Sequence, residues 1–432
     1  MDLEVKLIVW FGLATLSAPA AELAIPYVYT ETKDYSQEPV RFPGGAAIQI
    51  VRNGRKSALF PTFAASSDAA ISFDGRRIVF AGRQRAQDPW QIWEGPVGGP
   101  PVRIVQEGDA IAPFYLPGGK IVYSRRIAGG FQIEVTALDT RLAHRLTFAP
   151  GNFVVCGVLR DGRILFEGRH PAGGAGRRDL YTIYSDGSGV ETYRCDHGKD
   201  RGAGRELASG DILFEAGRRL AKFVSARAGE QAFEQPDGEF AGPVAEIAAG
   251  DLLVSYRPNP SLPFSLYRWR QLPAKLEKLQ GNAYQSALVR PHEIPRRHPS
   301  ALGDRDGANL LCLNVYETRE AIRPASVAAV RVWTQDGAGA TVELGRAPVA
   351  ADGSFFVQVP EDRPIRFELL DRNGKTEAAE HGWFWARRGE QRICVGCHAG
   401  PARAAENLVP GVLEHNPEPV QLKMPAPHRS SN

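Results

Sequence analysis

The sequence predicts an all-β protein, in which a β-propeller of about six blades precedes a small β-sandwich-like unit. The 432 residues include 45 glycines and 32 prolines, a turn-rich composition that favours many short strands over long helices. A polar turn followed by a short aliphatic strand recurs five times along the first two thirds of the chain. Further strand-like stretches follow after the repeats end. With 43% hydrophobic residues, the chain can build a large core.

The first twenty residues carry the features of a secretory signal peptide. The apolar run from Leu7 to Leu16 is too short to span a hydrocarbon layer of about 30 Å. Small residues at Ala18 and Ala20 follow it and suit a signal peptidase, although a core strand is an alternative reading. We therefore expect residues 1–20 to be a signal peptide and the protein to be periplasmic or otherwise exported. No later apolar run is long enough to predict a transmembrane segment.

The repeats predict a β-propeller over residues 40–290. When their strands are aligned, the equivalent residues stand 43, 43, 48 and 40 positions apart; they are Ile78, Ile121, Ile164, Ile212 and Leu252. A period of about 40–45 residues is typical of propeller blades with four short strands. One four-stranded sheet cannot cover both of its own faces, so each blade is expected to pack against its neighbours.

The two ends of the propeller are expected to close on each other. Residues 47–51 resemble the outer strand of a repeat that lacks its inner partners. We expect those partners near Phe264–Trp269, which would complete a sixth blade and leave no open edge. The Asp-Gly turns before the inner strands resemble those of TolB-type propellers, a likeness that implies shape alone.

Residues 291–309 are predicted to be an exposed linker, because prolines and a basic run dominate their first part. His292 and His298 in this segment are six residues apart with a proline between them. This arrangement does not match the paired histidines of a helical zinc site.

Residues 310–392 are predicted to form a small antiparallel sandwich. Its expected strands are Leu310–Val315, Val327–Trp333, Thr341–Leu344, Phe355–Val359 and Ile365–Leu369.

The charge balance points to no particular polyanionic partner. There are 52 lysines and arginines against 49 aspartates and glutamates, and the two signs are interspersed. We therefore expect no nucleic-acid partner.

The last segment, residues 393–432, contains the motif that carries chemistry. Cys394, Cys397 and His398 form a C-x-x-C-H sequence, the attachment signature of c-type haem. Two thiols at this spacing can each form a thioether with one porphyrin vinyl group, and the next histidine can bind the iron from below. We expect one covalent haem c, with His398 as the proximal ligand. A structural or redox-active cysteine pair is one alternative, and a zinc site completed by His381 and His415 is another.

The distal side of this haem is not determined by the motif. Only 34 residues follow His398, too few for the helical shell of a free-standing cytochrome c, so the β-rich unit or the propeller must cover the haem. A five-coordinate iron is one prediction; otherwise the candidate distal ligands are His381, His415, His428 and Met424. Trp383 and Trp385 are expected either to pack on the porphyrin or to belong to the protein core.

Three further cysteines have no pairing that the sequence determines. Cys156 and Cys195 are candidates for a disulfide between neighbouring blades, and Cys312 for a position near the haem.

The segments around the motif resemble the haem-bearing middle domain of hydrazine synthase alpha subunits. The similar segments are Leu310–Tyr316, Asp352–Val357 and Gly382–Trp385, the last leading into the C-x-x-C-H motif. The resemblance implies a propeller ahead of this domain, thioether attachment at Cys394 and Cys397, and a metal ligand at His398. The family has a tyrosine four residues after the motif histidine, where this chain has Ala402. Hydrazine synthesis itself is therefore not predicted.

These observations together predict an exported, cytochrome-like protein with one haem. It would pass electrons or bind a small ligand at the haem, and the propeller would serve as a docking platform. The partner would be a redox protein or a small molecule, and the chain is a candidate subunit of a larger complex. The alternative is a binding or scaffolding propeller whose C-terminal cysteine pair is structural.

Overall fold

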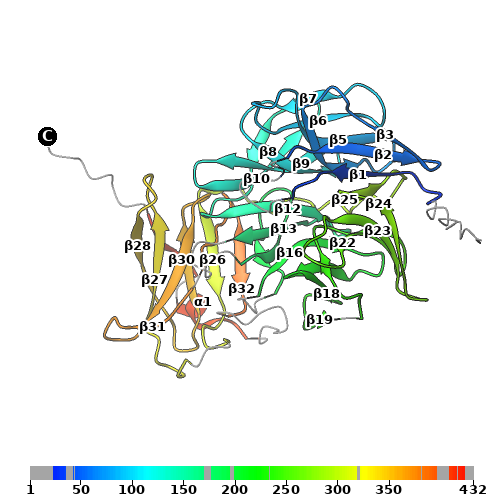
Figure 1. Ribbon diagram of the computed structural model, residues 1–432. Helices are drawn as coiled ribbons and strands as arrows, with labels where there is room; N and C mark the ends of the chain where they lie inside the picture. Colours follow the sequence, from blue (N-terminus) through cyan, green and yellow to red (C-terminus); the bar gives the residue numbers. More distant parts are fainter. Residues whose placement is uncertain are drawn as a thin grey trace, which may run out of the picture.

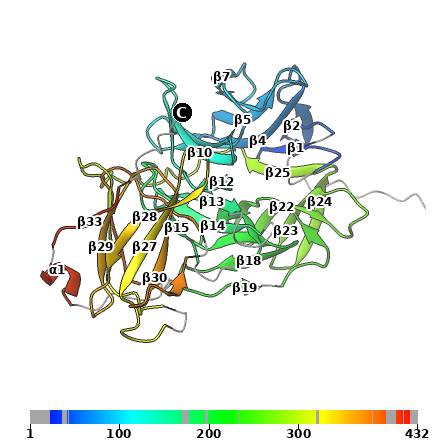
Figure 2. The same ribbon diagram turned by 90° about the vertical axis from the view of Figure 1, so that its left-hand side faces the viewer.

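The computed structural model describes residues 23–35, 42, 44–169, 177–194, 199–232, 234–318, 322–380, 382–396, 408–415 and 417–423. Among these residues the one helix is short, α1 (Gly411–His415), and all other regular elements are strands. Figures 1 and 2 show two bodies side by side, a propeller coloured blue to green and a sandwich coloured yellow to red. The prediction of an all-β chain is confirmed.

The propeller has six blades, as expected. Blade 1 consists of β25 (Ala283–Leu288), β1 (Tyr27–Glu31), β2 (Ala47–Arg52) and β3 (Arg55–Ala58). Blade 2 consists of β4 (Ala65–Ile71), β5 (Arg77–Arg83), β6 (Gln91–Pro96) and β7 (Val102–Val105). Blade 3 consists of β8 (Ala110–Leu116), β9 (Lys120–Ile127), β10 (Gly130–Ala137) and β11 (Ala143–Arg145).

The remaining blades follow in chain order. Blade 4 consists of β12 (Asn152–Val158), β13 (Ile164–Arg169), β14 (Asp179–Ile183) and β15 (Glu191–Thr192). Blade 5 consists of β16 (Arg201–Glu206), β17 (Ile212–Ala216), β18 (Arg219–Phe223) and β19 (Gln231–Ala232). In blade 6, β20 (Glu239–Phe240) and β21 (Ala245–Ala248) both pair with β22 (Asp251–Arg257), which is followed by β23 (Ser265–Arg270) and β24 (Lys275–Gln280).

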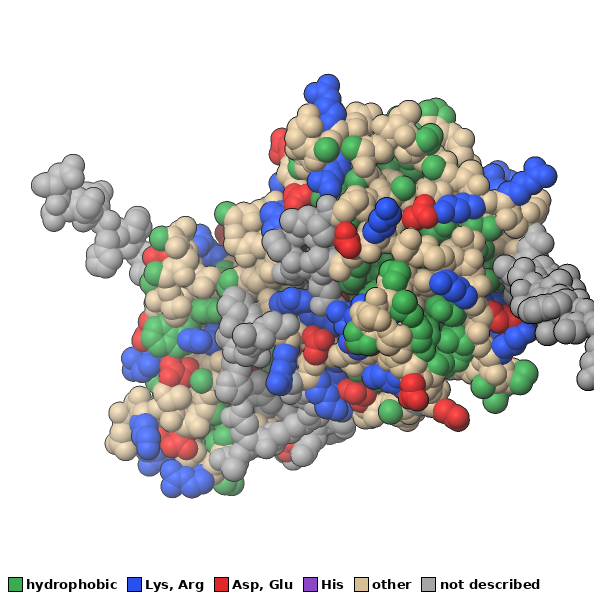
Figure 3. Space-filling model, viewed as in Figure 1, with side chains coloured by type: hydrophobic (Ala, Val, Ile, Leu, Met, Phe, Trp, Pro, Cys, Tyr) green, Lys and Arg blue, Asp and Glu red, His purple; other side chains and the backbone are tan. Residues whose placement is uncertain are grey.

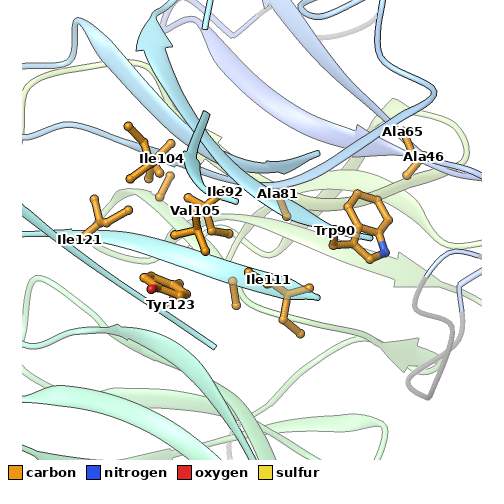
Figure 4. Packing of buried hydrophobic residues seen from close by; sticks show 14 of the residues in the cluster. Ala46, Ala65, Ala81, Trp90, Ile92, Ile104, Val105, Ile111, Ile121 and Tyr123 are labelled. Atoms are coloured by element: carbon orange, nitrogen blue, oxygen red, sulfur yellow. The ribbon is translucent and has the colours of Figure 1, made fainter. Parts of the chain in front are cut away.

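The five aligned repeat residues all lie on the second strand of a blade, and none is more than 2% exposed. They are buried because the faces of neighbouring blades pack on each other. Figure 4 shows this between blades 2 and 3, where Ile92 and Val105 lie over Ile111 and Ile121. A polar contact supplements the packing, since the Tyr115 hydroxyl of blade 3 donates to Glu94 of blade 2 at 2.9 Å.

The closure of the ring differs from the prediction. β1 pairs with β25, so the inner strand of blade 1 comes from residues 283–288. Residues 264–269, the expected partner, instead fall on and just before β23 of blade 6. β1 also lies ahead of residue 40, where the propeller was expected to begin. The sequence of β25, AYQSAL, has few large apolar residues and so resembles no repeat strand.

The sandwich consists of two four-stranded sheets. The first has the order β32 (Gln391–Cys394), β26 (Ala308–Cys312), β29 (Phe355–Val359) and β33 (Val420–Gln421). The second has the order β28 (Thr341–Pro348), β27 (Ala329–Gln335), β30 (Ile365–Leu370) and β31 (Thr376–Ala379). The first sheet is mixed rather than antiparallel, because β32 pairs with β26 and β33 with β29 in parallel. Residues 391–394 and 420–421 thus belong to the sandwich, although they were not among its predicted strands.

A tryptophan joins the sandwich to the propeller. Trp385 is 1% exposed, its indole Nε1 donates to the Leu146 carbonyl at 2.9 Å, and its ring meets Phe153 edge-on at 5.7 Å. The Glu390 carboxylate accepts from the Gly189 amide of blade 4 at 3.1 Å. Trp385 therefore belongs to the interface core, the second of the two roles predicted for it.

The segment from 289 to 300 is held along the turns of several blades. The His292 amide donates to the Phe73 carbonyl at 3.0 Å, and the Arg296 amide donates to the Arg160 carbonyl at 2.9 Å. Pro295 is buried, although the residues around it are exposed, as predicted for this linker. The segment follows the propeller surface because its amides pair with the carbonyl groups of the blade turns.

Candidate functional site

The described part of the C-x-x-C-H motif lies at the end of an edge strand. Cys394 is the last residue of β32, and its carbonyl accepts a hydrogen bond from the Leu313 amide at 2.9 Å. Its side chain is half-buried. Figure 1 shows β32 as the sandwich strand nearest the propeller. The strand therefore carries the first cysteine of the motif to one end of the sandwich.

Two turns and the short helix meet at the same end. The Val315 amide, in the turn after β26, donates to the carbonyl of Gly353, just before β29, at 2.9 Å. Asp352 accepts from the Gly411 amide at 2.6 Å, and the Ser354 hydroxyl accepts from the Val412 amide at 2.9 Å. These bonds attach the first turn of α1 to the start of β29, at the outer side of the sandwich in Figure 2.

Electrostatics favour the ionised form of Asp352. Burial alone would raise the pKa of Asp352, but hydrogen bonds from the Gly411 amide and from Ser354 outweigh burial and hold the pKa below its usual value. The carboxylate therefore stays charged and caps α1 at neutral pH.

Gly396, the second residue between the two cysteines of the motif, is packed closely on the turn after β26. A Cβ atom added to Gly396 would lie 2.2 Å from the Glu317 carbonyl oxygen and 2.8 Å from that of Asn314. Such a contact is far inside the van der Waals limit, so the chain follows this path only with glycine here. The path of Val395 and Gly396 is thereby constrained by the sandwich.

Cys312 is brought next to the motif by strand pairing. The parallel register of β26 and β32 sets Cys312 directly opposite Cys394. Residues that are paired across a sheet project to the same face, and Cys312 is 3% exposed in the sandwich core. The predicted position of Cys312 near the motif agrees with this register, although 82 positions separate the two cysteines in the sequence.

Exposed apolar side chains accompany the motif. Ile393 is 59% exposed, immediately before Cys394, and Leu408 and Val409, just ahead of α1, are 75% and 65% exposed. A porphyrin is a large apolar ring, and burying such side chains against it would remove them from water. The described residues at this end of the sandwich therefore fit a covalently attached haem.

The other predicted site residues are only partly described. Cys397, His398, His381, Met424 and His428 lie outside the described residues, as does Ala402. His415 is the last residue of α1, and its side chain is not described.

Of the remaining predicted aromatic and cysteine residues, Trp383 and Cys156 are described. Trp383 is half-buried beneath the Arg366 guanidinium, which lies 5.0 Å from its ring. Cys156 is buried in blade 4, which raises the pKa of its thiol to about 12; Cys195 lies outside the described residues.

No group of three or more His, Cys, Asp or Glu side chains in the described ranges is arranged to hold a metal ion. In the linker, His298 stacks on Tyr184 at 3.7 Å and His292 lies 5.3 Å from Phe73. Across the described residues, no helix is long and apolar enough to cross a membrane. On the face in Figure 3, basic side chains lie among acidic ones.

Comparison with known proteins matches both the motif region and the whole fold. Residues 319–399 match the family model described as the hydrazine synthase alpha subunit middle domain. The hydrazine synthase structure from Kuenenia stuttgartiensis superimposes with a TM-score of 0.78 at 16% identity, covering 91% of this chain and 72% of that chain. The chain resembles a hydrazine synthase alpha subunit. The resemblance predicted from the sequence is thus confirmed, and at this identity the structural likeness concerns the fold.

Two further structures share less. TolB from Acinetobacter baumannii has a TM-score of 0.48 at 14% identity, over 61% of this chain and 66% of that chain. A chain of the nidogen/laminin complex has a TM-score of 0.44 at 12% identity, over 62% of this chain and 98% of that chain. No curated protein sequence matches this chain.

Proposed function

We propose that this hydrazine synthase alpha-like chain carries one covalent haem c. Cys394 and Cys397 would form the thioethers and His398 would be the proximal iron ligand. The observation that carries the proposal is the C-x-x-C-H motif leaving an edge strand at one end of the sandwich, beside exposed apolar side chains. When bound, the haem supplies an iron that exchanges single electrons or binds a small ligand.

The described residues contribute order around the attachment point. β32 is held along its length by parallel pairing with β26, and Gly396 itself packs on the turn at Glu317. Just before Cys394, the Arg392 guanidinium is neutralised by Glu390 at 2.7 Å and lies 5.7 Å from the Phe384 ring. A rigid strand leading into the motif presents the first thiol in one position, which favours a defined haem orientation.

The setting of the protein follows from the same proposal. The apolar run at Leu7–Leu16 supports export, and c-type haem is compatible with that environment. The matched family model describes a subunit, so we further propose that the chain associates with other subunits or with a redox partner, with the propeller as the docking platform. Electron transfer or small-ligand redox chemistry at the haem would then be its activity.

The test is to produce the full chain in a host with the c-haem maturation machinery. We expect a Soret band that stays with the polypeptide after denaturation and extraction, and an intact mass increased by one haem. Cys394→Ser should lower the covalent haem content, whereas Cys156→Ser should retain it, because Cys156 is buried in blade 4. His398→Ala should keep the added mass and change the axial-ligand bands of the spectrum.

A second candidate function is favoured by the position of Cys312 opposite Cys394. If the purified protein is colourless and its mass shows no tetrapyrrole, the cysteines at this end of the sandwich are structural. The molecule would then be a binding or scaffolding propeller. Peptide mapping of the thiols would show how Cys312, Cys394 and Cys397 are bonded.

A further inference from the structure

The centre of the propeller holds a partly open cavity of about 100 Å³, far from the C-x-x-C-H motif in the chain. It is lined mainly by the first strands of the blades, including Asp68 of β4, Ala112 of β8, Arg205 of β16 and Gln285 of β25. An engineered protein cavity of about 150 Å³ binds benzene, so this smaller cavity suits a smaller ligand. The cavity therefore holds a ligand of only a few non-hydrogen atoms.

Bulges in these first strands shape the wall. The strand register shifts at Asp68, Ala112, Ala203 and Gln285, and each of the four has a positive φ between 50° and 57°. Bulges of this kind re-aim backbone amides and side chains, and they occur often beside binding sites.

The carboxylates of the cavity wall already have partners. Asp68 accepts from the Ala112 amide at 3.0 Å and from the Gln285 side-chain amide at 2.8 Å. Glu167 accepts from the Ala203 amide at 2.9 Å. Glu215 accepts from Arg178 at 3.3 Å, and Arg178 is also paired with Asp200 and Glu167. Arg178 thus compensates Glu167 and Glu215, whereas Asp68 is held by neutral amides, and Oε1 of Glu215 makes no hydrogen bond with a described residue.

Arg205 differs from Arg178 in this respect. Its guanidinium donates to the Gly204 carbonyl at 3.2 Å and lies 4.7 Å from the Phe114 ring, but no described carboxylate comes within salt-bridge distance of it. A guanidinium stays protonated in proteins, so Arg205 keeps a positive charge inside the propeller, and the Asp68 carboxylate of the same wall attracts it without forming a salt bridge. Arg205 is partly exposed and lines the cavity, so an anion that enters it can reach guanidinium N–H groups with which no described carboxylate pairs.

One hydroxyl of the wall lacks a hydrogen-bond partner among the described residues. The Ser286 hydroxyl is buried and makes no hydrogen bond there. Buried polar groups are nearly always satisfied, so a missing partner points to a bound molecule at the cavity. The apolar part of the wall, which includes Phe114, Ile111 and Pro243, suits a short aliphatic group.

We propose that the central cavity of the propeller binds a small carboxylate of one to three carbons through Arg205. A carboxylate matches the planar fork of a guanidinium and can accept two parallel hydrogen bonds from it. The site does not depend on the proposed haem function, because its residues all belong to the propeller.

The test is calorimetric titration of the full chain with sodium formate, acetate and propionate, against sodium chloride at equal ionic strength. We expect saturable binding of at least one of the three and none of benzoate, whose ring exceeds the cavity. Arg205→Gln should weaken binding about 10- to 100-fold, the usual loss for a hydrogen bond to a charged group. Arg372→Gln, at an exposed arginine of the sandwich, should bind as the parent does.

The size series and the variants can each overturn the proposal. If none of the three carboxylates binds saturably, or if benzoate binds as well as acetate, the cavity is not the site. Arg205→Lys keeps the positive charge but lacks the planar guanidinium. It provides a second variant at this position in case Arg205→Gln does not fold. Unweakened carboxylate binding by a folded Arg205→Gln variant would also refute the role of Arg205. A small carboxylate could also bind a haem iron, and only binding in the cavity should be weakened by Arg205→Gln, so the variant separates the two sites.

Discussion

Replacement of Trp385 tests whether this residue joins the sandwich to the propeller or faces a haem. The side chain is 1% exposed, packs on Phe153, and donates to the Leu146 carbonyl. Trp385→Ala removes the ring from a packed interface, which typically costs about 3–5 kcal/mol. Trp385→Phe retains most of the apolar contact but leaves the Leu146 carbonyl without its donor, at a cost of about 1–3 kcal/mol.

The assay is urea unfolding followed by tryptophan fluorescence and by far-UV circular dichroism, so that separate unfolding of the two bodies is detected. Trp383→Phe is the matched control, because Trp383 is half-buried and should lose less than Trp385→Phe. In haem-loaded protein, Trp385→Phe should leave the Soret spectrum unchanged. An unchanged unfolding midpoint together with a shifted Soret band would refute the interface assignment and place Trp385 at the haem.

Three further predictions concern the motif end of the sandwich and blade 4. Gly396→Ala should lower stability by about 1–3 kcal/mol and reduce thioether formation, because the added Cβ would overlap the Glu317 carbonyl. Thermal melting and intact mass measure the two effects. Gly382→Ala is the control and should cause neither effect, since a Cβ at Gly382 would have no other atom within 4 Å. Asp352→Asn should cost about 0.5–2 kcal/mol at pH 7 through the weakened cap of α1. The pKa of Asp352 is lower in the folded protein than its unfolded value of 3.8, so the charged carboxylate stabilises the fold above that value. This stabilisation is lost as the pH falls through the folded pKa, and the difference in melting temperature between parent and variant should therefore vanish in acid. A difference that stays constant with pH would contradict this reasoning. The Cys156 thiol, buried and with its pKa raised to about 12, should react with a thiol reagent at pH 8 only after unfolding, and rapid labelling of the native protein would show that blade 4 opens.

The local patterns of the sequence were sufficient to predict the class of the fold. Alternating apolar strands and Gly-containing turns act over a few residues, so the second strands of blades 2 to 6 could be recognised from Ile78 to Leu252. The C-x-x-C-H motif is local in the same sense, since its chemistry depends on three side chains within five positions. The family resemblance also came from short segments near the motif.

The contacts between distant segments were decided by tertiary structure alone. β25 completes blade 1 because the ring must close, although its sequence lacks the repeat pattern, and β32 lies in parallel beside β26 because the chain returns to the sandwich. The partners of Asp68, Glu167 and Arg178 follow from how the blades meet at the centre of the propeller, and so does the absence of a salt bridge between Arg205 and a described carboxylate. Strand patterns record which face of a strand is buried, whereas the choice of neighbouring strand depends on the packing of the whole chain. That is why the sequence determined the architecture and the motif, and only the folded chain determined the closure, the interface at Trp385 and the central cavity.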